Sequence, residues 1–405
     1  MCLFWAAALH AAATKIKYND IPAQIFAKNG QVQSQIAERD AAQSQTGYLE
    51  RSFWPHMSLS LASEYQDNPT TAREKPPQMA LDIAANLYRG GRDALEESQL
   101  HLEVQQRNAD VYRVYLSELA AAQENYWQIV ALSEQIRHHE DSLTRIRQAT
   151  KAAKHRVSRG LTTNTDFLEF ERQYDLISEQ IDTLKQDQKE RSMVLATQLG
   201  TSADIRLQES IPDPDERPLQ TAKLTAEQHP DMTALQAEID ILLGEKSKLS
   251  YQSRPRLDVY SGSEAYTSDR LDLAAGIRMQ MPLFEGMHIE KDQAALDHQL
   301  TAKRLLREHQ MKALQTSIDT TQTRLRYLDQ LTQRAKQRII RTEVFLKATL
   351  ADYDRGVKNA SDVRNAIETY RQDKIEETER RLEYQITKVR LKGLVYCPQL
   401  RNSLN

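Results

Sequence analysis

The stretch Arg159-Gly160-Leu161-Thr162-Thr163-Asn164-Thr165-Asp166 recurs about 196 residues later as Arg355-Gly356-Val357-Lys358-Asn359-Ala360-Ser361-Asp362. In both copies an arginine–glycine pair leads into a short run that ends in aspartate. Glycine is the usual residue at the positive φ angle that ends a helix, and small polar residues favour the start of the next one. The recurrence therefore predicts two matching turns, each between two helices.

Two further pairs of similar stretches extend the duplication. Leu87-Tyr88-Arg89-Gly90 matches Leu283-Phe284-Glu285-Gly286 at the same offset. Trp54-Pro55-His56-Met57 matches Arg254-Pro255-Arg256-Leu257 at an offset of about 200 residues. The offset changes only once along the chain. A duplication in which a single loop was shortened would produce this pattern. Each half is predicted to contain, in order, a helix (22–47 and 221–248), a strand pair, a long helix, a turn and a returning helix.

The duplication divides the chain into five predicted segments. They are a signal-like segment (1–13), a first structural repeat (14–200), a linker or equatorial region (201–220), a second structural repeat (221–396) and a C-terminal tail (397–405). The first segment is apolar and rich in alanine but has no positively charged start. It is interpreted as a secretory signal, with a buried N-terminal turn as the alternative.

Four runs alternate between apolar and polar residues, as half-buried strands do. They cover about 55–65 and 78–88 in the first half, and about 255–266 and 270–284 in the second. Each run is about ten residues long, which is the length of a tilted strand that crosses a bilayer, and aromatic residues stand near the ends. A soluble sheet packed on a core is the alternative. In lipid, four strands cannot close a barrel, so several copies would have to share one.

Helical periodicity fills most of the remaining chain. The predicted helical hairpins cover about 92–199 and 287–391. In the first, apolar residues follow one another in steps of 3 and 4, as in Ile129, Leu132, Ile136, His139 and Leu143, which is the spacing of a heptad seam. A helix from 92 to 158 would be about 100 Å long at its usual rise per residue. The seam alone does not distinguish a coiled-coil spacer from the wall of a tunnel.

Composition and motifs exclude several classes of function. The formal net charge is -3 and no basic block stands out, so a nucleic-acid partner is not expected. No phosphate-binding loop, dinucleotide fingerprint or zinc-protease motif occurs, so neither a cofactor nor an enzyme is expected. His138-His139-Glu140 is not predicted to bind metal, because adjacent helical residues point to different sides. His139 is expected on the seam, and His138 is expected to face away from it.

The duplicated order and its turn motifs resemble the TolC-type outer-membrane efflux proteins over about residues 18–396. The resemblance implies a mainly α protomer with a small membrane β part, built from two copies of a strand pair plus a long α-hairpin. It implies a homotrimer with a twelve-stranded β-barrel in outer-membrane lipid and a twelve-helix α-barrel tunnel, most of which lies in the periplasm.

The same resemblance implies a function and partners. The expected function is the outer-membrane channel of a tripartite efflux or type I secretion system, with an iris-like periplasmic gate. The expected partners are a periplasmic adaptor protein and an inner-membrane transporter. A non-conducting periplasmic coiled-coil adaptor or scaffold is the alternative, although such an adaptor would lack the twofold repeat.

The resemblance also implies a gate at the two turns. Gly160 and Gly356 would mark the tips at the periplasmic entrance, and Asp362 of three copies would form a ring of carboxylates. Asn365 stands where the family often has a second acid. Tyr353 and Lys358 match the second-half partners of links that hold the family's entrance shut, and Asp166 matches a first-half acid. The alternative role of Asp166 and Asp362 is helix N-capping.

Overall fold

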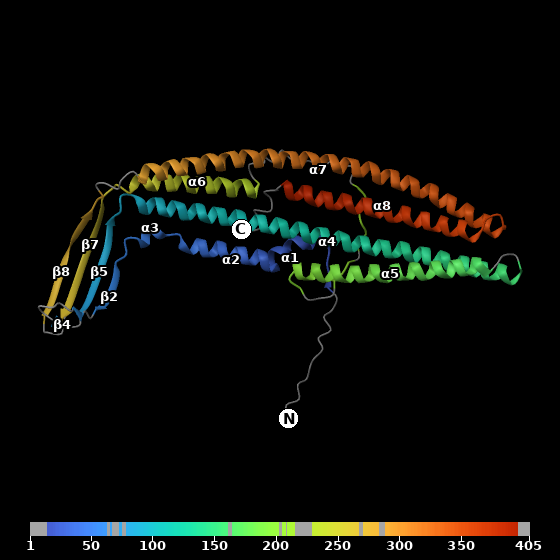
Figure 1. Ribbon diagram of the computed structural model, residues 1–405, viewed down its shortest axis with the longest axis horizontal. Coiled ribbons are helices and arrows are strands. Elements are labelled where there is room, and N and C mark those ends of the chain that lie inside the picture. The colour runs from blue at the N-terminus through green and yellow to red at the C-terminus, as the bar shows by residue number, and fades with distance from the viewer. Residues whose placement is uncertain are drawn as a thin grey trace, which may run out of the picture. The chain divides into compact units, whose positions relative to one another are not determined.

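The computed structural model describes ten stretches of the chain, labelled by element in Figure 1. These are residues 14–62, 65–66, 73–74, 78–160, 164–201, 205–207, 209–214, 229–266, 270–282 and 288–395. The predicted signal-like segment and C-terminal tail lie outside them, as do the 283–286 copy of the duplicated motif, Leu161 to Thr163 of the first turn and half of the linker (202–204, 208 and 215–220).

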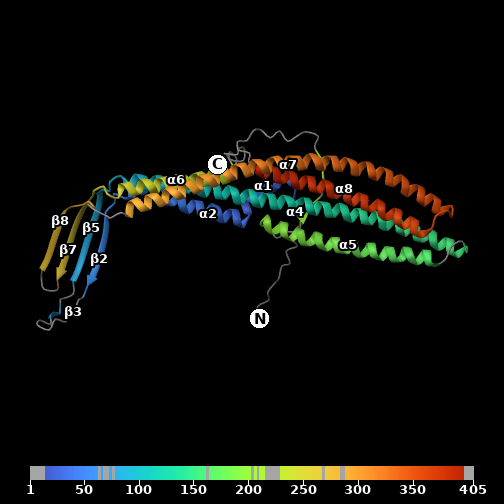
Figure 2. The same cartoon turned by 45° about the horizontal axis from the view of Figure 1, so that its top comes forward.

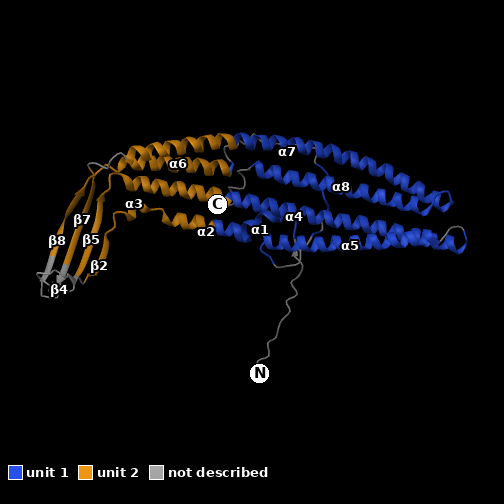
Figure 3. Cartoon of the chain, in the orientation of Figure 1, with its two compact units in different colours: residues 1–35, 112–229, 311–405 blue, residues 36–111, 230–310 orange. Residues whose placement is uncertain are grey.

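The chain folds into two compact units, each built from both halves of the sequence (Figure 3). Unit 1 contains residues 1–35, 112–229 and 311–405, and unit 2 contains residues 36–111 and 230–310. Helices dominate both, so the prediction of a mainly helical protein is confirmed. None of the described helices is both long enough and apolar enough to cross a membrane.

The two long hairpins have the same dimensions. In the first, α4 (Arg92–Ser158) has 67 residues and α5 (Asn164–Gln198) has 35. In the second, α7 (His288–Asp354) also has 67 residues and α8 (Ala360–Leu394) also has 35. Gly160 and Gly356 follow the outgoing helices with φ angles of +68° and +82°, a conformation that residues with a Cβ rarely adopt. Each hairpin thus has the same two helix lengths on either side of an equivalent glycine turn, as an internal duplication produces.

The shorter helices differ from the prediction at one point. They are a 3-10 turn (Tyr18–Asp20), α1 (Ile21–Lys28), α2 (Gly30–Gln45), α3 (Tyr48–Arg51) and α6 (Pro230–Tyr251). The single helix predicted over 22–47 is therefore wrong, because the chain leaves the helical conformation at Asn29, with φ −68° and ψ 124°.

Asn29 explains this break, because its side chain caps the second helix. Its Oδ1 accepts hydrogen bonds from the backbone N–H groups of Gln31 (3.0 Å) and Val32 (3.2 Å). Its Nδ2 donates to Glu118 on α4 (3.0 Å) and to the carbonyl of Gln198 on α5 (2.9 Å). The Asn29 side chain thus accepts from the free N–H groups at the start of α2, and its own N–H groups also have partners. These hydrogen bonds stabilise the break between the two helices.

Unit 2 holds an antiparallel sheet in the order β2-β5-β7-β8, visible side by side in Figure 2. The strands are β2 (His56–Ala62), β5 (Gln78–Tyr88), β7 (Arg256–Tyr266) and β8 (Arg270–Gln280). The strand pairs of the two halves thus join through β5 and β7. Two minor pairs complete the list: β3 (Tyr65–Gln66) with β4 (Arg73–Glu74), and β1 (Thr14–Lys15) in parallel with β6 (Ile205–Arg206).

One apolar core of unit 1 lies near the two turns. All four long helices contribute buried side chains to it, among them Ile146 from α4, Phe170 from α5, Leu346 from α7 and Val363 from α8. Ile136 and His139 of the predicted seam are also buried. The 3-4 spacing thus predicted a buried face of α4, because residues at this spacing lie on one side of a helix.

Candidate functional site

The two faces of the sheet have opposite character. Along one cross-strand row Leu59 pairs with Leu81, which pairs with Ser263, which pairs with Leu273. Leu59 and Leu273 are 57% and 75% exposed. Large apolar side chains that remain exposed along a sheet indicate a surface that meets lipid or another protein. The chain alone leaves this face uncovered, so it is the first candidate site.

The other face is polar and closely packed. The next row joins Ser58, Asp82, Gly262 and Ala274. A second row places Tyr260 beside Gly276, and a Cβ built on that glycine would lie 3.0 Å from the Tyr260 hydroxyl oxygen. Arg278 stacks over the same ring, with its Cζ 4.7 Å from the centroid. Gly276 therefore makes room for a tyrosine that lies across the strands.

The second candidate site is the pair of turns in unit 1. Arg156, just before the first turn, donates a hydrogen bond to the carbonyl of Tyr353, just before the second. Its guanidinium also lies over the Tyr353 ring, 4.6 Å from the centroid. This contact ties the two halves of the chain together beside both turn glycines. Sequence reasoning missed Arg156, because one cation among many on a long helix carries no signal.

Tyr353 is buried in the core that the turns cap. It is 2% exposed and packs edge-on against Phe170, with 6.1 Å between ring centroids. Among the described residues nothing hydrogen-bonds to its hydroxyl. Burial raises the pKa of this hydroxyl, and the negative charge of Asp166 raises it further. A buried hydroxyl without a partner lowers the free energy of unfolding by about 1 to 3 kcal/mol, so the Tyr353 hydroxyl destabilises the fold.

Asp362 has a different capping role from the one predicted. Asn359 is the N-cap residue of α8 and accepts a hydrogen bond from the Asp362 backbone N–H at 2.9 Å. Asp362 in turn accepts from the Asn359 backbone N–H at 3.3 Å, so the two form a capping box. Asp362 therefore does take part in capping, the alternative role given to it, but as the third residue of α8, because Asn359 occupies the N-cap position. Asp166 lies in the first turn of α5.

The remaining predicted gate residues lie near this box. Lys358 Nζ is 3.8 Å from the Asp362 carboxylate, a pair within one chain. Asn365 accepts a hydrogen bond from Arg364 at 3.1 Å. Arg364 also pairs with Glu169 of α5 at 3.2 Å, a second link between the halves that sequence reasoning missed. The structure therefore gathers the predicted residues of the second half around one helix start.

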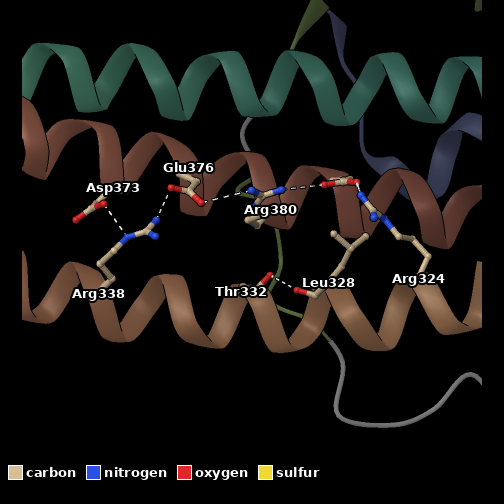
Figure 4. A network of polar contacts seen from close by, with 8 residues as sticks. Arg324, Leu328, Thr332, Arg338, Asp373, Glu376 and Arg380 are labelled. Atoms are coloured by element: carbon tan, nitrogen blue, oxygen red, sulfur yellow. Dashed lines mark hydrogen bonds and ion pairs between the residues drawn. The ribbon is translucent and has the colours of Figure 1, made fainter.

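A chain of charges joins the two helices of the second hairpin (Figure 4). Arg338 of α7 pairs with Asp373 (2.8 Å) and with Glu376 of α8, and Glu376 pairs with Arg380 (3.4 Å). The row continues through Glu383 of α8 to Arg324 of α7. Most of these side chains are substantially exposed, so each pair adds little stability alone, but the row sets the register of the two helices.

Residues 209–214 form a strap across the helices of unit 1. The backbone N–H of Ile211 donates to Glu134 of α4 at 3.0 Å, and its carbonyl accepts from Arg381 of α8 at 2.7 Å. Arg381 also pairs with Glu134 at 2.8 Å, and Asp213 pairs with Lys336 of α7 at 2.7 Å. The strap thus binds helices from both halves. Its sequence, rich in proline and acids, predicted only a linker.

The two histidines of α4 both face the second hairpin. His139 is 5% exposed, as the seam position predicts. The prediction that His138 faces away is wrong, since its Nε2 lies 3.1 Å from the Thr378 hydroxyl of α8. Because α8 lies along α4 here, positions on both sides of the seam are covered.

Comparisons with known proteins agree with this geometry. The family model for the outer membrane efflux protein matches residues 21–201. Solved channels share the fold over most of their length. CusC is 11% identical, with 93% of this chain and 91% of that chain covered and a TM-score of 0.79. The Campylobacter jejuni CmeC outer membrane channel is 12% identical (93% and 85%, TM-score 0.78).

The outer membrane protein VceC from Vibrio cholerae is 14% identical, with 93% of this chain and 95% of that chain covered and a TM-score of 0.75. Identities this low show a common fold and nothing finer. No curated protein matches the chain by sequence similarity.

Proposed function

We propose that the chain is a member of the TolC-type outer-membrane efflux protein family and the exit duct of a tripartite efflux or type I secretion system, in support of which the outer membrane efflux protein model matches residues 21–201 and solved channels share the fold. Members of this family are channel proteins of the bacterial outer membrane, with a large helical part in the periplasm. We infer the same location for this protein, together with the partners, the assembly and the gate.

The observation that carries the proposal is the sheet with an exposed apolar face. Leu61, Leu273 and Ile277 are 70% or more exposed on it, as a strand face in contact with lipid would be. Among the described strands, none pairs with the outer edge of β2 or of β8. Unpaired backbone groups are not tolerated in lipid, so the edges must be paired by further copies. Three copies, the number in this family, would close a twelve-stranded barrel.

The α-hairpins would form the wall of a twelve-helix tunnel in the same trimer. The two structural repeats (14–200 and 221–396) of each chain would then each contribute one sixth of the wall. The tips would meet a periplasmic adaptor that links the duct to an inner-membrane transporter. A conducting trimer of this kind needs no chemistry of its own, in line with a family of channels rather than enzymes.

The gate would lie at the turns, with Gly160 and Gly356 at the tips. In a trimer, Asp362 would contribute three carboxylates to one ring, and Asn365 would add a neutral ring one helical turn further on. Tyr353, Lys358 and Asp166 would supply the links that keep the entrance shut. In support, Lys358 and Asp362 already share an ion pair, and the charge of Asp166 acts on the Tyr353 hydroxyl.

Planar-bilayer recording on the purified full chain tests this proposal. Wild-type protein should show discrete conductance steps with long quiet periods. Asp362→Asn or Lys358→Ala should lengthen the open periods several-fold, whereas His309→Gln, on the exposed surface of α7, should not. A monomeric mass in detergent, without conductance from any of these proteins, would favour the non-conducting scaffold instead.

A further inference from the structure

Polar and charged side chains, several of them buried, interrupt the packing of α4 against α8 in unit 1. The exposed fractions are 6% for Glu134, 5% for His139, 7% for Arg371 and 8% for Glu377. α4 belongs to the first hairpin and α8 to the second, so these residues lie where the two hairpins meet. Any movement of one hairpin against the other must break the contacts made here.

His139 faces a permanent cation. Arg371 Nη1 lies 3.0 Å from both ring nitrogens of His139 and donates to Gln180 of α5 at 3.2 Å. Glu368 is the acidic partner of Arg371 on the other side. An arginine has only donors, so it is compatible with a neutral imidazole and repels a protonated one. Burial and Arg371 lower the pKa of His139 to about 4, while Glu368 opposes the shift.

His138 faces a second group of cations. Its Nε2 lies 3.1 Å from the Thr378 hydroxyl. Lys374 and Arg381 of α8, together with Arg137 of its own helix, disfavour a charge on the ring, and Asp141 alone favours it. Burial is the largest cause, and the pKa of His138 falls to about 4. Thus both histidines are neutral at pH 7 and both stand against positive charge.

We propose that His138 and His139 form a proton-sensitive latch that holds the two hairpins together when neutral and releases them when protonated. Protonation places two more positive charges against Arg371, Lys374 and Arg381 in a poorly hydrated contact. The hairpins then separate more easily at α4 and α8, which favours an open entrance at the turns. This regulation rests on the proposed function as a gated duct.

The direction of the effect follows from linkage. A histidine in water has a pKa of about 6.5, and the two latched rings have values of about 4. A released state with hydrated rings therefore binds protons more tightly than the latched state. The latch is at full strength above pH 6.5 and weakens as the pH falls towards 4. At pH 5, each ring shifts the balance about 30-fold towards release.

Single-channel recording between pH 7.5 and pH 5 on the full chain tests the latch. This range stays above the pKa of ordinary carboxylates, which is about 4. Wild-type protein should open more than tenfold as often at pH 5 as at pH 7.5. The double variant His138→Gln, His139→Gln should lose this rise. The control His155→Gln, an exposed histidine on the same helix, should keep it. A double variant that keeps the rise, or a wild type that conducts at both pH values without a rise, would overturn the latch.

Hydrogen exchange supplies a readout that does not depend on conductance or on the variants folding. In wild-type protein, amides of residues 368–381 should exchange faster at pH 5 than at pH 7.5, after correction for intrinsic rates. Amides 318–331 of α7, away from both histidines, should not. Equal protection of 368–381 at both pH values rejects the latch. A protein that never conducts but shows the acid-dependent exchange retains the latch and loses the duct.

Discussion

The two hairpins have helices of 67 and 35 residues each, yet their long helices are buried very differently. α4 carries buried side chains along most of its length, including Tyr115, Tyr126 and Ile146. α7 exposes Ile340 and Val344, both at 64%. The two hairpins therefore have equal helix lengths but pack differently. The first outgoing helix is an internal support, and the second leaves an apolar side open.

The largest expected effect is at the strap that binds the hairpins together. Arg381→Ala should lower the free energy of unfolding by about 3 to 5 kcal/mol, because Glu134 and the Ile211 carbonyl would lose their buried cationic partner. Urea unfolding in detergent, followed by circular dichroism, measures it. Arg338→Ala, in a more exposed pair of the same hairpin, should cost at most about 1 kcal/mol. Equal costs would mean that the strap adds nothing.

The second prediction tests the burial difference directly. Ile146→Ala on α4, where the side chain is fully buried, should cost about 2 to 5 kcal/mol. Ile340→Ala on α7 should cost less than about 0.5 kcal/mol in the monomeric chain. Both are measured by urea unfolding of monomer and of assembled protein. An Ile340→Ala cost that rises on assembly would sharpen the comparison, since another copy would then cover this side of α7.

The third prediction concerns the unpartnered hydroxyl at the turns. Tyr353→Phe should raise the free energy of unfolding by about 1 kcal/mol, because it removes a buried oxygen without a partner and keeps the ring against Phe170. Thermal unfolding compares it with Tyr370→Phe, a ring of the same cluster. The gain is expected for the monomeric chain. A loss of stability in the assembled protein would show that the hydroxyl has a partner there, as a gate link requires.

The smallest effect is expected at the start of α8. Asn359→Ala should cost about 1 kcal/mol, since it removes the acceptor of the capping box. Asn359→Asp keeps an acceptor and should be close to neutral. If Asn359→Ala leaves stability unchanged but alters the quiet state of the channel, the box positions Asp362 rather than stabilising the fold.

Much of the architecture was predictable because it depends on local periodicity. The alternating runs predicted the four long strands, and the 3-4 spacing predicted that Ile136 and His139 are buried. Positive φ angles at Gly160 and Gly356 were predictable from the residue type alone. The break at Asn29 was missed, since its partners Glu118 and Gln198 lie 89 and 169 residues away.

By itself, the sequence determined the elements, their order and their twofold repetition, since spacing and turn residues act over a few neighbours. Only the tertiary structure decided which charged residues matter. Arg381 and Glu134 are 247 residues apart, and Arg371 and His139 are 232 apart. In a chain with 27% charged residues, no local pattern selects these pairs. Their selection depends on which helix faces come together, because burial turns an ordinary solvated charge into one that requires a partner.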